Sequence, residues 1–303
     1  MKLPSFPYKR TVVAIAMICI SLFVSCEKEV HINLATGPPQ VVVEGAVETG
    51  LPPYVVLTST ISFFSQIDLT TLENSFLHGA KVTVSDGTNA ITLREYSIDT
   101  GSNNKFYIYT IDTAALGNIM LGQVGKFYSL SVTYNNATYT ALTQIPYPKG
   151  VDSMWFDVPT FQSNKVPLNA RQLFVNYTDP DTPGNYVRYF TRRNNEPYYP
   201  SGIFSDDAVN GLQVKNIGLI AGYNNTTDAN GDSLRYFYPG DTVYLKWCEI
   251  DKGVYTFLNS LNFAANSTGN PFASPINVQT NMTNGALGIW AGYGSIITRK
   301  VVQ

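Results

Sequence analysis

The feature of this sequence that most constrains its fold is a series of short β-branched runs separated by turn residues. The run 81–85 alternates apolar and polar residues strictly and stops at Asp86-Gly87, a dipeptide typical of hairpin turns. Similar runs occupy residues 41–48, 54–58, 91–94, 105–110, 128–134 and 138–143. Short strands with regular turn signals over about 100 residues are typical of two packed sheets, so we predict an immunoglobulin-like β-sandwich over residues 40–148.

A second β-rich domain is predicted over residues 151–303, and a Pro-rich break separates it from the first. Its candidate strands are 153–158, 173–177, 186–191, 212–216, 234–238, 242–247 and 295–302. One segment has helical spacing instead, because apolar residues recur three and four positions apart between Val254 and Leu261. We predict a helix over 252–265 with Asp251 as its N-cap, and a mainly β fold overall.

Residues 1–25 have the pattern of a secretory signal peptide that ends at a lipidation site. A basic start without acidic residues precedes an apolar run over 12–24, which is shorter than the roughly 20 residues of a membrane span. The small Ser25 before Cys26 resembles a lipobox, in which the cysteine is diacylated and becomes the new N-terminus. The alternative is an ordinary signal peptide with an incidental cysteine. We expect residues 26–39 to form a tether that holds the protein at the membrane through lipid.

Processing at Cys26 would change the charge of the chain and its cysteines. The full sequence has 20 Lys+Arg and 22 Asp+Glu; loss of the three basic residues in 1–25 leaves 17 against 22, a net charge of −5. This balance gives no support to nucleic-acid binding. Cys248 would be the one free thiol, and its strand-like surroundings predict a buried core residue. The alternative, a nucleophile, would need a nearby base from His31 or His78.

Several segments of the chain resemble, in the same order, those of one known family. These segments are 26–34, 79–87, 139–153, 185–188, 239–243, 269–272 and 284–288. On them the chain resembles Bacteroidetes outer-membrane lipoproteins of the domain of unknown function 4249 family. The resemblance implies no catalytic residue, and it implies an accessory role beside a TonB-dependent outer-membrane transporter. Glu27 and Glu29, after Cys26, also resemble a signal for export of lipoproteins to the cell surface.

Acidic residues suggest two chemical sites, each with a simpler alternative. Asp179-Pro180-Asp181 and Asp206-Asp207 could pair as carboxylates of a hydrolase, which needs two such groups about 5–9 Å apart. The alternative is that they are acidic turn residues. Residues 228–233 begin like a calcium loop around Asp228 but lack the glycine and glutamate of an EF-hand, so a hairpin turn on Asn230-Gly231 is favoured over a loose calcium site. We predict no metal and no cofactor.

Aromatic side chains are the main candidates for binding. The sequence contains no nucleophile elbow, zinc-protease, phosphate-loop or dinucleotide motif, so we expect no enzyme. Tyr198 and Tyr199 lie in a polar loop, and Trp290 and Tyr293 lie in an Asn- and Gly-rich segment, 281–294, that looks like a loop. We expect these four residues to contact a ligand or partner, because Tyr and Trp are frequent interface anchors. The alternative is packing in a β core.

The sequence thus predicts an outer-membrane-anchored lipoprotein that is a non-catalytic binding or accessory subunit of a TonB-dependent transport system. The alternative is a structural or adhesive cell-surface protein without a transporter partner. A third hypothesis is a carboxylate-dependent hydrolase, which requires Asp181, Asp206 and Asp207 to lie together. The ligand is left open.

Overall fold

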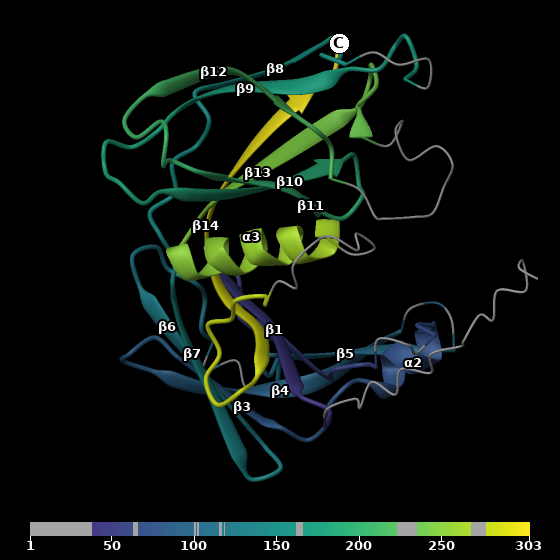
Figure 1. Cartoon of the computed structure of the whole chain (residues 1–303), viewed down its shortest axis with the longest axis vertical. Coiled ribbons are helices and arrows are strands. Elements are labelled where there is room, and N and C mark those ends of the chain that lie inside the picture. The colour runs from purple at the N-terminus through teal and green to yellow at the C-terminus, as the bar shows by residue number, and fades with distance from the viewer. Residues whose placement is uncertain are drawn as a thin grey trace, which may run out of the picture. The chain divides into compact units, whose positions relative to one another are not determined.

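The computed structural model describes residues 38–62, 66–99, 101, 103–114, 117, 119–161, 166–222, 235–267 and 277–303. The predicted signal peptide, Cys26 and most of the predicted tether lie outside these residues. The strands are β1 (Val41–Glu48), β2 (Tyr54–Ser59), β3 (Lys81–Ser85), β4 (Ala90–Asp99), β5 (Lys105–Thr110), β6 (Phe127–Tyr134), β7 (Ala137–Gln144), β8 (Ser153–Asp157), β9 (Gln172–Thr178), β10 (Tyr186–Arg193), β11 (Tyr199–Ser205), β12 (Gln213–Leu219), β13 (Thr242–Ile250) and β14 (Leu287–Val301), with helices α2 (Leu69–Asn74) and α3 (Lys252–Ser267) (Figure 1). The predicted mainly β fold class is confirmed. Among the described residues, no helix is both long and apolar enough to cross a membrane.

The first half of the chain folds around one buried core. An 11-stranded sheet has the order β11-β10-β13-β14-β1-β2-β5-β4-β3-β6-β7. The long strand β4 pairs with β3 through residues 90–93 and with β5 through residues 94–99, so it belongs to two parts of this sheet. Val43 and Leu57 from β1 and β2 share a buried cluster with Leu130 from β6. Two parts of one sheet therefore contribute to the same core, an arrangement that fits the predicted sandwich.

Two tight turns connect neighbouring strands of this half, and the first of them is the turn predicted at Asp86-Gly87. Between β3 and β4, the Asp86 carboxylate accepts a hydrogen bond from Asn89 N (2.7 Å), and Gly87 has a φ of 86°. Between β6 and β7, Asn135 and Asn136 have φ values of 47° and 63°. Asparagine tolerates this left-handed region better than most residues, which explains why the chain turns there.

The last strand, β14, contacts both halves of the chain. Its residues 287–293 pair in parallel with residues 42–48 of β1, and its residues 294–301 pair antiparallel with β13. The backbone of β7 also approaches it closely: Gly292 N donates to Thr143 Oγ1 (2.9 Å), and a Cβ at Gly292 would lie 2.1 Å from Gln144 O. Only glycine permits this approach. The strand predicted over 295–302 therefore begins earlier, at Leu287.

The sheet is continuous across the predicted domain boundary. Residues Pro39–Gln303 form one compact unit, and β14 links β1, from the segment 40–148, to β13, from the segment 151–303. The division of the chain into two domains stays a prediction.

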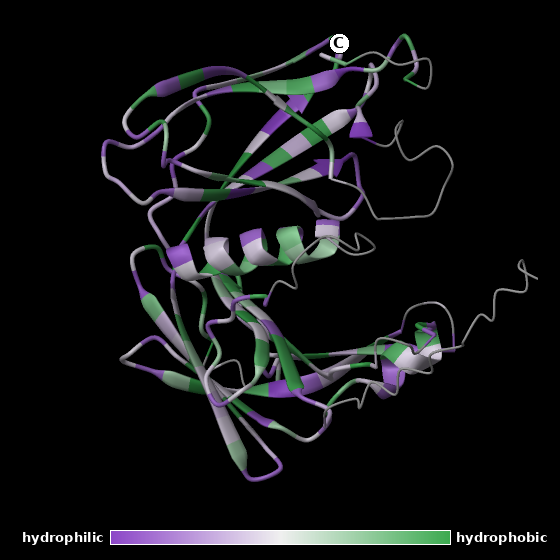
Figure 2. Cartoon of the chain, viewed as in Figure 1, coloured by the Kyte–Doolittle hydropathy of each residue, from purple (hydrophilic) through white to green (hydrophobic). Residues whose placement is uncertain are grey.

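A second core lies between a three-stranded sheet, β12-β9-β8, and the strands β10, β13 and the end of β14. Along β13, Val243, Leu245 and Trp247 belong to this core, whereas Cys248 belongs to another cluster on the opposite face. This is the period of two that a strand imposes on its side chains. Figure 2 shows it as alternating bands of hydropathy along β13. Glu249 is the next residue of β13 on the same face as Val243, Leu245 and Trp247, so this otherwise apolar face carries one carboxylate.

Helix α3 covers the opposite face of the sheet, where its residues Val254 and Leu258 are buried with Cys248. The predicted N-cap is confirmed, because Asp251 Oδ1 accepts a hydrogen bond from Val254 N (2.9 Å). The other carboxylate oxygen accepts one from Gln144 N (3.2 Å), which fixes the start of the helix to the end of β7. The helix ends at Ser267, slightly beyond the predicted end.

Three elements differ from the sequence prediction. Residues 235–238 form no strand; Phe237 makes a single bridge to Arg171 instead, and residue 234 lies outside the described residues. The short helix α2 was not predicted. Nor was β11, because Pro200 and Gly202 are residues that strands disfavour; β11 is an edge strand, where such residues are tolerated.

Candidate ligand-binding cavity

A cavity of ≈ 220 Å³ lies in the second half of the chain, beside the core between the two sheets. Strands β9 and β12 line one side, and β10, β11 and β13 line the other. Tyr177 and Trp247 are buried and occupy inward positions of β9 and β13, where alternation places them. Val214 and Ile217, on β12, are only half-buried. Regular strands, which hold side chains more firmly than loops do, therefore form most of the cavity wall, whereas Asp179, Asn185, Asp206 and Val209 come from the loops that follow or precede the strands.

Aromatic rings form one wall of this cavity. Phe204 from β11 stacks on Trp247 with ring centroids 5.9 Å apart and an interplanar angle of 23°. Tyr177 contacts Trp247 from the other sheet at 5.1 Å, tilted by 45°. Such a surface accommodates a flat apolar group.

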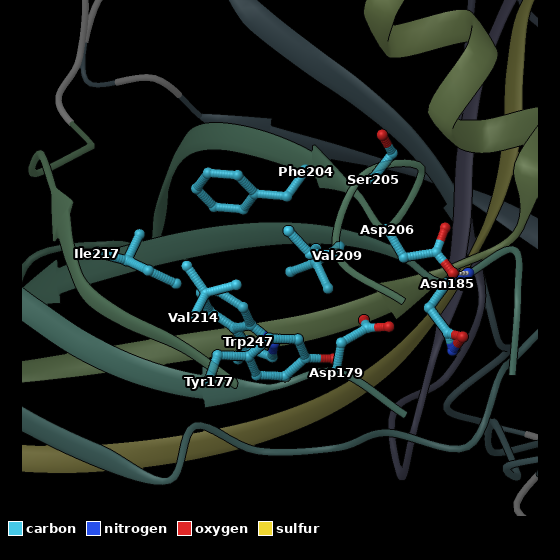
Figure 3. A pocket seen from close by; sticks show the side chains of 11 residues that line it. Tyr177, Asp179, Asn185, Phe204, Ser205, Asp206, Val209, Val214, Ile217 and Trp247 are labelled. Carbon is cyan, nitrogen blue, oxygen red and sulfur yellow. Dashed lines mark hydrogen bonds between the residues drawn. The ribbon is translucent and has the colours of Figure 1, made fainter. Parts of the chain in front are cut away.

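Carboxylates gather toward the opposite end of the cavity (Figure 3). Asp206 accepts hydrogen bonds from the backbone N–H groups of Gly184 (2.7 Å) and Asn185 (3.0 Å), and is 4% exposed. Asp179 accepts one from Gly211 N (3.2 Å) and is 5% exposed. Burial raises the pKa of Asp179, and the negative charge of Asp206 raises it further. Both carboxylates are thus held in place by the backbone, and Asp179 senses the charge of Asp206.

A third carboxylate, Glu249, lies next to this group. Its Oε1 accepts a hydrogen bond of 2.8 Å from the hydroxyl of Tyr177. Burial raises the pKa of Glu249 to about 7, and the charges of Asp179 and Asp206 add to this effect. Glu249 also lines a larger, more polar cleft of ≈ 570 Å³, near Lys149 and Asp251. The Tyr177–Glu249 pair therefore contributes to both hollows.

The indole nitrogen of Trp247 is buried and lacks a hydrogen bond. Nε1 lies near the Tyr177 hydroxyl. It makes no hydrogen bond of acceptable geometry with this hydroxyl or with any other residue in the described parts of the chain. Because a buried donor without a partner is costly, this group marks a place where an acceptor atom is missing.

Of the acidic residues predicted from the sequence, Asp179 and Asp206 line the same cavity, whereas the trio Asp181, Asp206 and Asp207 does not lie together. Of Asp181, Asp206 and Asp207, Asp206 lines the cavity, whereas the other two are exposed. Asp207 instead accepts a hydrogen bond from Ser205 Oγ (2.9 Å). Asp179 is the second aspartate that lines this cavity with Asp206, and each of the two accepts backbone N–H groups.

Two of the four predicted aromatic contacts are buried rather than presented at a surface. Trp290 is fully buried in β14, and its Nε1 donates to Tyr128 O (2.9 Å). Tyr293 is 8% exposed, and its hydroxyl accepts a hydrogen bond from Arg188 (2.7 Å). The expectation that 281–294 is a loop that presents Trp290 is wrong, because the loop ends at the turn containing Gly285 and the strand begins immediately after it.

The other two aromatic candidates are half-buried. Arg192 lies 5.0 Å and Lys246 lies 5.1 Å from the ring centroid of Tyr198. These distances are those of cation–π contacts. Tyr199 is the first residue of β11. Both tyrosines keep exposed surface and remain candidates for a partner contact.

Cys248 is fully buried and free, as predicted. Burial raises the pKa of its thiol far above the usual value, which makes it unreactive. His78 contacts Glu95 in the first half of the chain. No group of His, Cys, Asp and Glu within the described ranges is arranged to hold a metal ion. His31 and the predicted turn at 228–233 lie outside those ranges.

Glu249 is the functional candidate that sequence reasoning missed. Its signal was present in the series Val243, Leu245, Trp247, Glu249, where a charged residue takes an inward position of a buried strand. Because a buried carboxylate needs a partner, this pattern predicts a donor on a facing element, which the structure supplies as Tyr177.

Comparisons with known proteins add no family assignment: no family model matches this chain, and no curated protein matches it. The resemblance to the domain of unknown function 4249 family stays a prediction from the segments that carry it.

Proposed function

We propose that this protein is a lipid-anchored outer-membrane lipoprotein and a non-catalytic binding or accessory subunit of a TonB-dependent transport system. The observation that carries the binding role is the cavity between β9–β12 and β10–β13, with an aromatic wall and a carboxylate end. Cavities with mainly apolar walls and a few fixed polar groups are typical of ligand sites.

The way the carboxylates are held favours binding over catalysis. Asp206 and Asp179 accept backbone N–H groups, and Glu249 accepts the Tyr177 hydroxyl, so each is oriented before a ligand arrives. Preorganised groups lower the entropic cost of binding. The thiol of Cys248 belongs to the cluster on the opposite face of β13 and does not line the cavity.

The membrane role is supported by the sequence at Cys26. Two acyl chains give stable anchoring, whereas one gives marginal binding. An extended tether over 26–39 would reach up to about 50 Å from the membrane, at about 3.3–3.6 Å per residue. That length is sufficient for the folded part to contact the outer surface of a neighbouring transporter.

The test is affinity purification of the tagged full-length protein from membranes solubilised in mild detergent. We expect a large β-barrel protein to co-purify in a stoichiometric amount. A Tyr198→Ala variant should recover less of it, while Tyr147→Ala, which removes another exposed tyrosine, should recover the same amount. Isolation of a monomer without a β-barrel partner would overturn the accessory role and favour the adhesive or structural alternative.

A further inference from the structure

We propose that the cavity beside Trp247 binds a small organic amine in its ammonium form, with a flat apolar body and one hydrogen-bond-accepting oxygen. The inference rests on the proposed binding function and names its ligand class. Three features of the cavity carry it: its charge, its unpartnered donor and its size.

The charge of the cavity favours a cation. Asp179 and Asp206 line it, and Glu249 lies beside it on the hydroxyl of Tyr177. Among the described residues, none of these three carboxylates forms a salt bridge. The nearby cation, Lys149, is bonded to Asp152 (3.1 Å). An ammonium group between the two lining carboxylates would supply the missing positive charge, and its hydrogen bonds would be charge-assisted.

The unpartnered donor calls for an oxygen on the ligand. The Trp247 side chain is 2% exposed and lines the cavity, and its buried Nε1–H finds no acceptor in the described parts of the protein. An ammonium cannot accept this hydrogen bond, whereas a hydroxyl or carbonyl oxygen can. A ligand with both groups satisfies the carboxylate end and the indole at once.

The volume and the walls set the ligand's size and shape. A cavity of about 150 Å³ with apolar walls holds a benzene molecule. The ≈ 220 Å³ found here has room for a ring of that size with a short amine arm. Figure 3 shows the carboxylates of Asp179 and Asp206 toward one end and Ile217 toward the other, with the ring of Phe204 between the two ends. The ring would therefore lie along Phe204 and Trp247 while the amine reaches the acidic end.

The experiment uses three probes of nearly equal shape, tested by calorimetric titration of the full-length protein in detergent. Tyramine carries an ammonium, tyrosol replaces it with a neutral hydroxyl, and 4-hydroxyphenylacetate replaces it with a carboxylate. We expect tyramine to bind at least about tenfold more tightly than tyrosol, because hydrogen bonds to charged groups are stronger than neutral ones. We expect 4-hydroxyphenylacetate to bind most weakly of the three.

Two variants locate the site. Asp179→Asn removes one lining carboxylate but keeps an acceptor for Gly211 N, and should weaken tyramine binding by about tenfold with a smaller effect on tyrosol. Trp247→Phe keeps a ring and removes the N–H, and should weaken both probes. The matched control is Asp207→Asn, an exposed neighbour of Asp206 that does not line the cavity. Its affinities should equal those of the wild type, and circular dichroism of each variant reports whether it folds.

Either of two results overturns the inference: absence of tyramine binding at millimolar concentration, or equal affinity for tyramine and tyrosol in the wild type. An Asp179→Asn variant that folds and keeps the full preference for the amine also overturns it. These outcomes are independent of the partner test. Recovery of a β-barrel partner without amine binding would retain the accessory function and reject the ligand class. Amine binding without a β-barrel partner would retain the ligand class and reject the accessory function.

Discussion

The hydroxyl of Tyr177 on β9 donates a 2.8 Å hydrogen bond to Oε1 of Glu249 on β13, and so joins the two sheets through a polar contact inside an apolar core. Burial raises the pKa of Glu249 to about 7, from an ordinary value of 4.5. Asp179 and Asp206 raise it too, whereas Tyr177 and Lys149 lower it. The protonation state of this side chain therefore changes close to neutral pH.

Glu249→Gln should remove a pH dependence of folding. Because the pKa of Glu249 is higher in the folded chain, the folded state binds the extra proton, and stability falls as pH rises from about 4.5 to about 7. The wild type should lose about 3 kcal/mol of unfolding free energy across this window relative to the variant, by denaturant titration at several pH values. Parallel pH profiles for the two proteins would contradict this. Tyr177→Phe is a control with the opposite effect. It removes the hydrogen bond that lowers the pKa of Glu249, so the loss of unfolding free energy should continue to higher pH.

Gly292→Ala should separate β7 from β14. A Cβ at this position would lie 2.1 Å from Gln144 O, and backbone atoms cannot move aside cheaply. We expect a loss of about 2 kcal/mol or more in denaturant unfolding. Gly117→Ala is the matched control, since a Cβ there meets nothing within 4 Å, and it should stay within about 0.5 kcal/mol of the wild type. Equal stability of the two variants would refute the close packing.

Thiol labelling should count one buried cysteine in the mature protein. Burial raises the pKa of Cys248, so iodoacetamide should label nothing rapidly in the native state and one thiol per chain in denaturant. A Ser153→Cys variant, exposed at the start of β8, should add one rapidly labelled thiol and so verify the reagent. Two labelled thiols in the denatured wild type would mean that Cys26 carries no lipid, and three would mean that the segment with Cys19 is retained as well.

Cys26→Ala should lose acylation and move from the membrane to the soluble fraction. The reason is the predicted lipobox, because its acyl chains would attach to this thiol and provide the membrane affinity. Metabolic labelling of the cells with radioactive palmitate, followed by fractionation, measures both acylation and location. Ser25→Ala, which keeps a small residue before the cysteine, should remain acylated. A Cys26→Ala protein that stays in the membrane fraction would show that the anchor lies elsewhere.

Much of the fold could be predicted from residues 81–85, 105–110 and similar runs. Apolar and polar residues alternate along a strand that has one buried face, and this alternation is visible in the sequence. The helix was predicted for the same kind of reason, and its N-cap by the side-chain chemistry of Asp251. The edge strand β11 was not predicted, because Pro200 and Gly202 interrupt the residue pattern that indicates a strand. The early part of β14 was not predicted either. Close packing against neighbouring backbone requires Gly288 and Gly292, but in the sequence these glycines are typical of a loop.

The candidate site was harder to predict than the fold. The sequence drew attention to Asp179 and Asp206, but it could not show that they line one cavity together with Trp247, which lies on a strand far from both in the chain. Trp290 looked exposed for the converse reason: its burial comes from β1 and from Tyr128, which are distant in sequence. Pairings of this kind depend on topology, which local patterns do not contain.

The position of β14 has a consequence for the order of folding. Thr49 and Tyr293 are bonded although 244 positions separate them, so the contact order of this pairing is high. Until the last strand emerges, β1 and β13 each present an unpaired edge, and such edges are templates for aggregation. Completion of the sheet is therefore a late and slow step. A chain that is cut before Leu287 would keep both edges open and should depend on chaperones to remain dispersed.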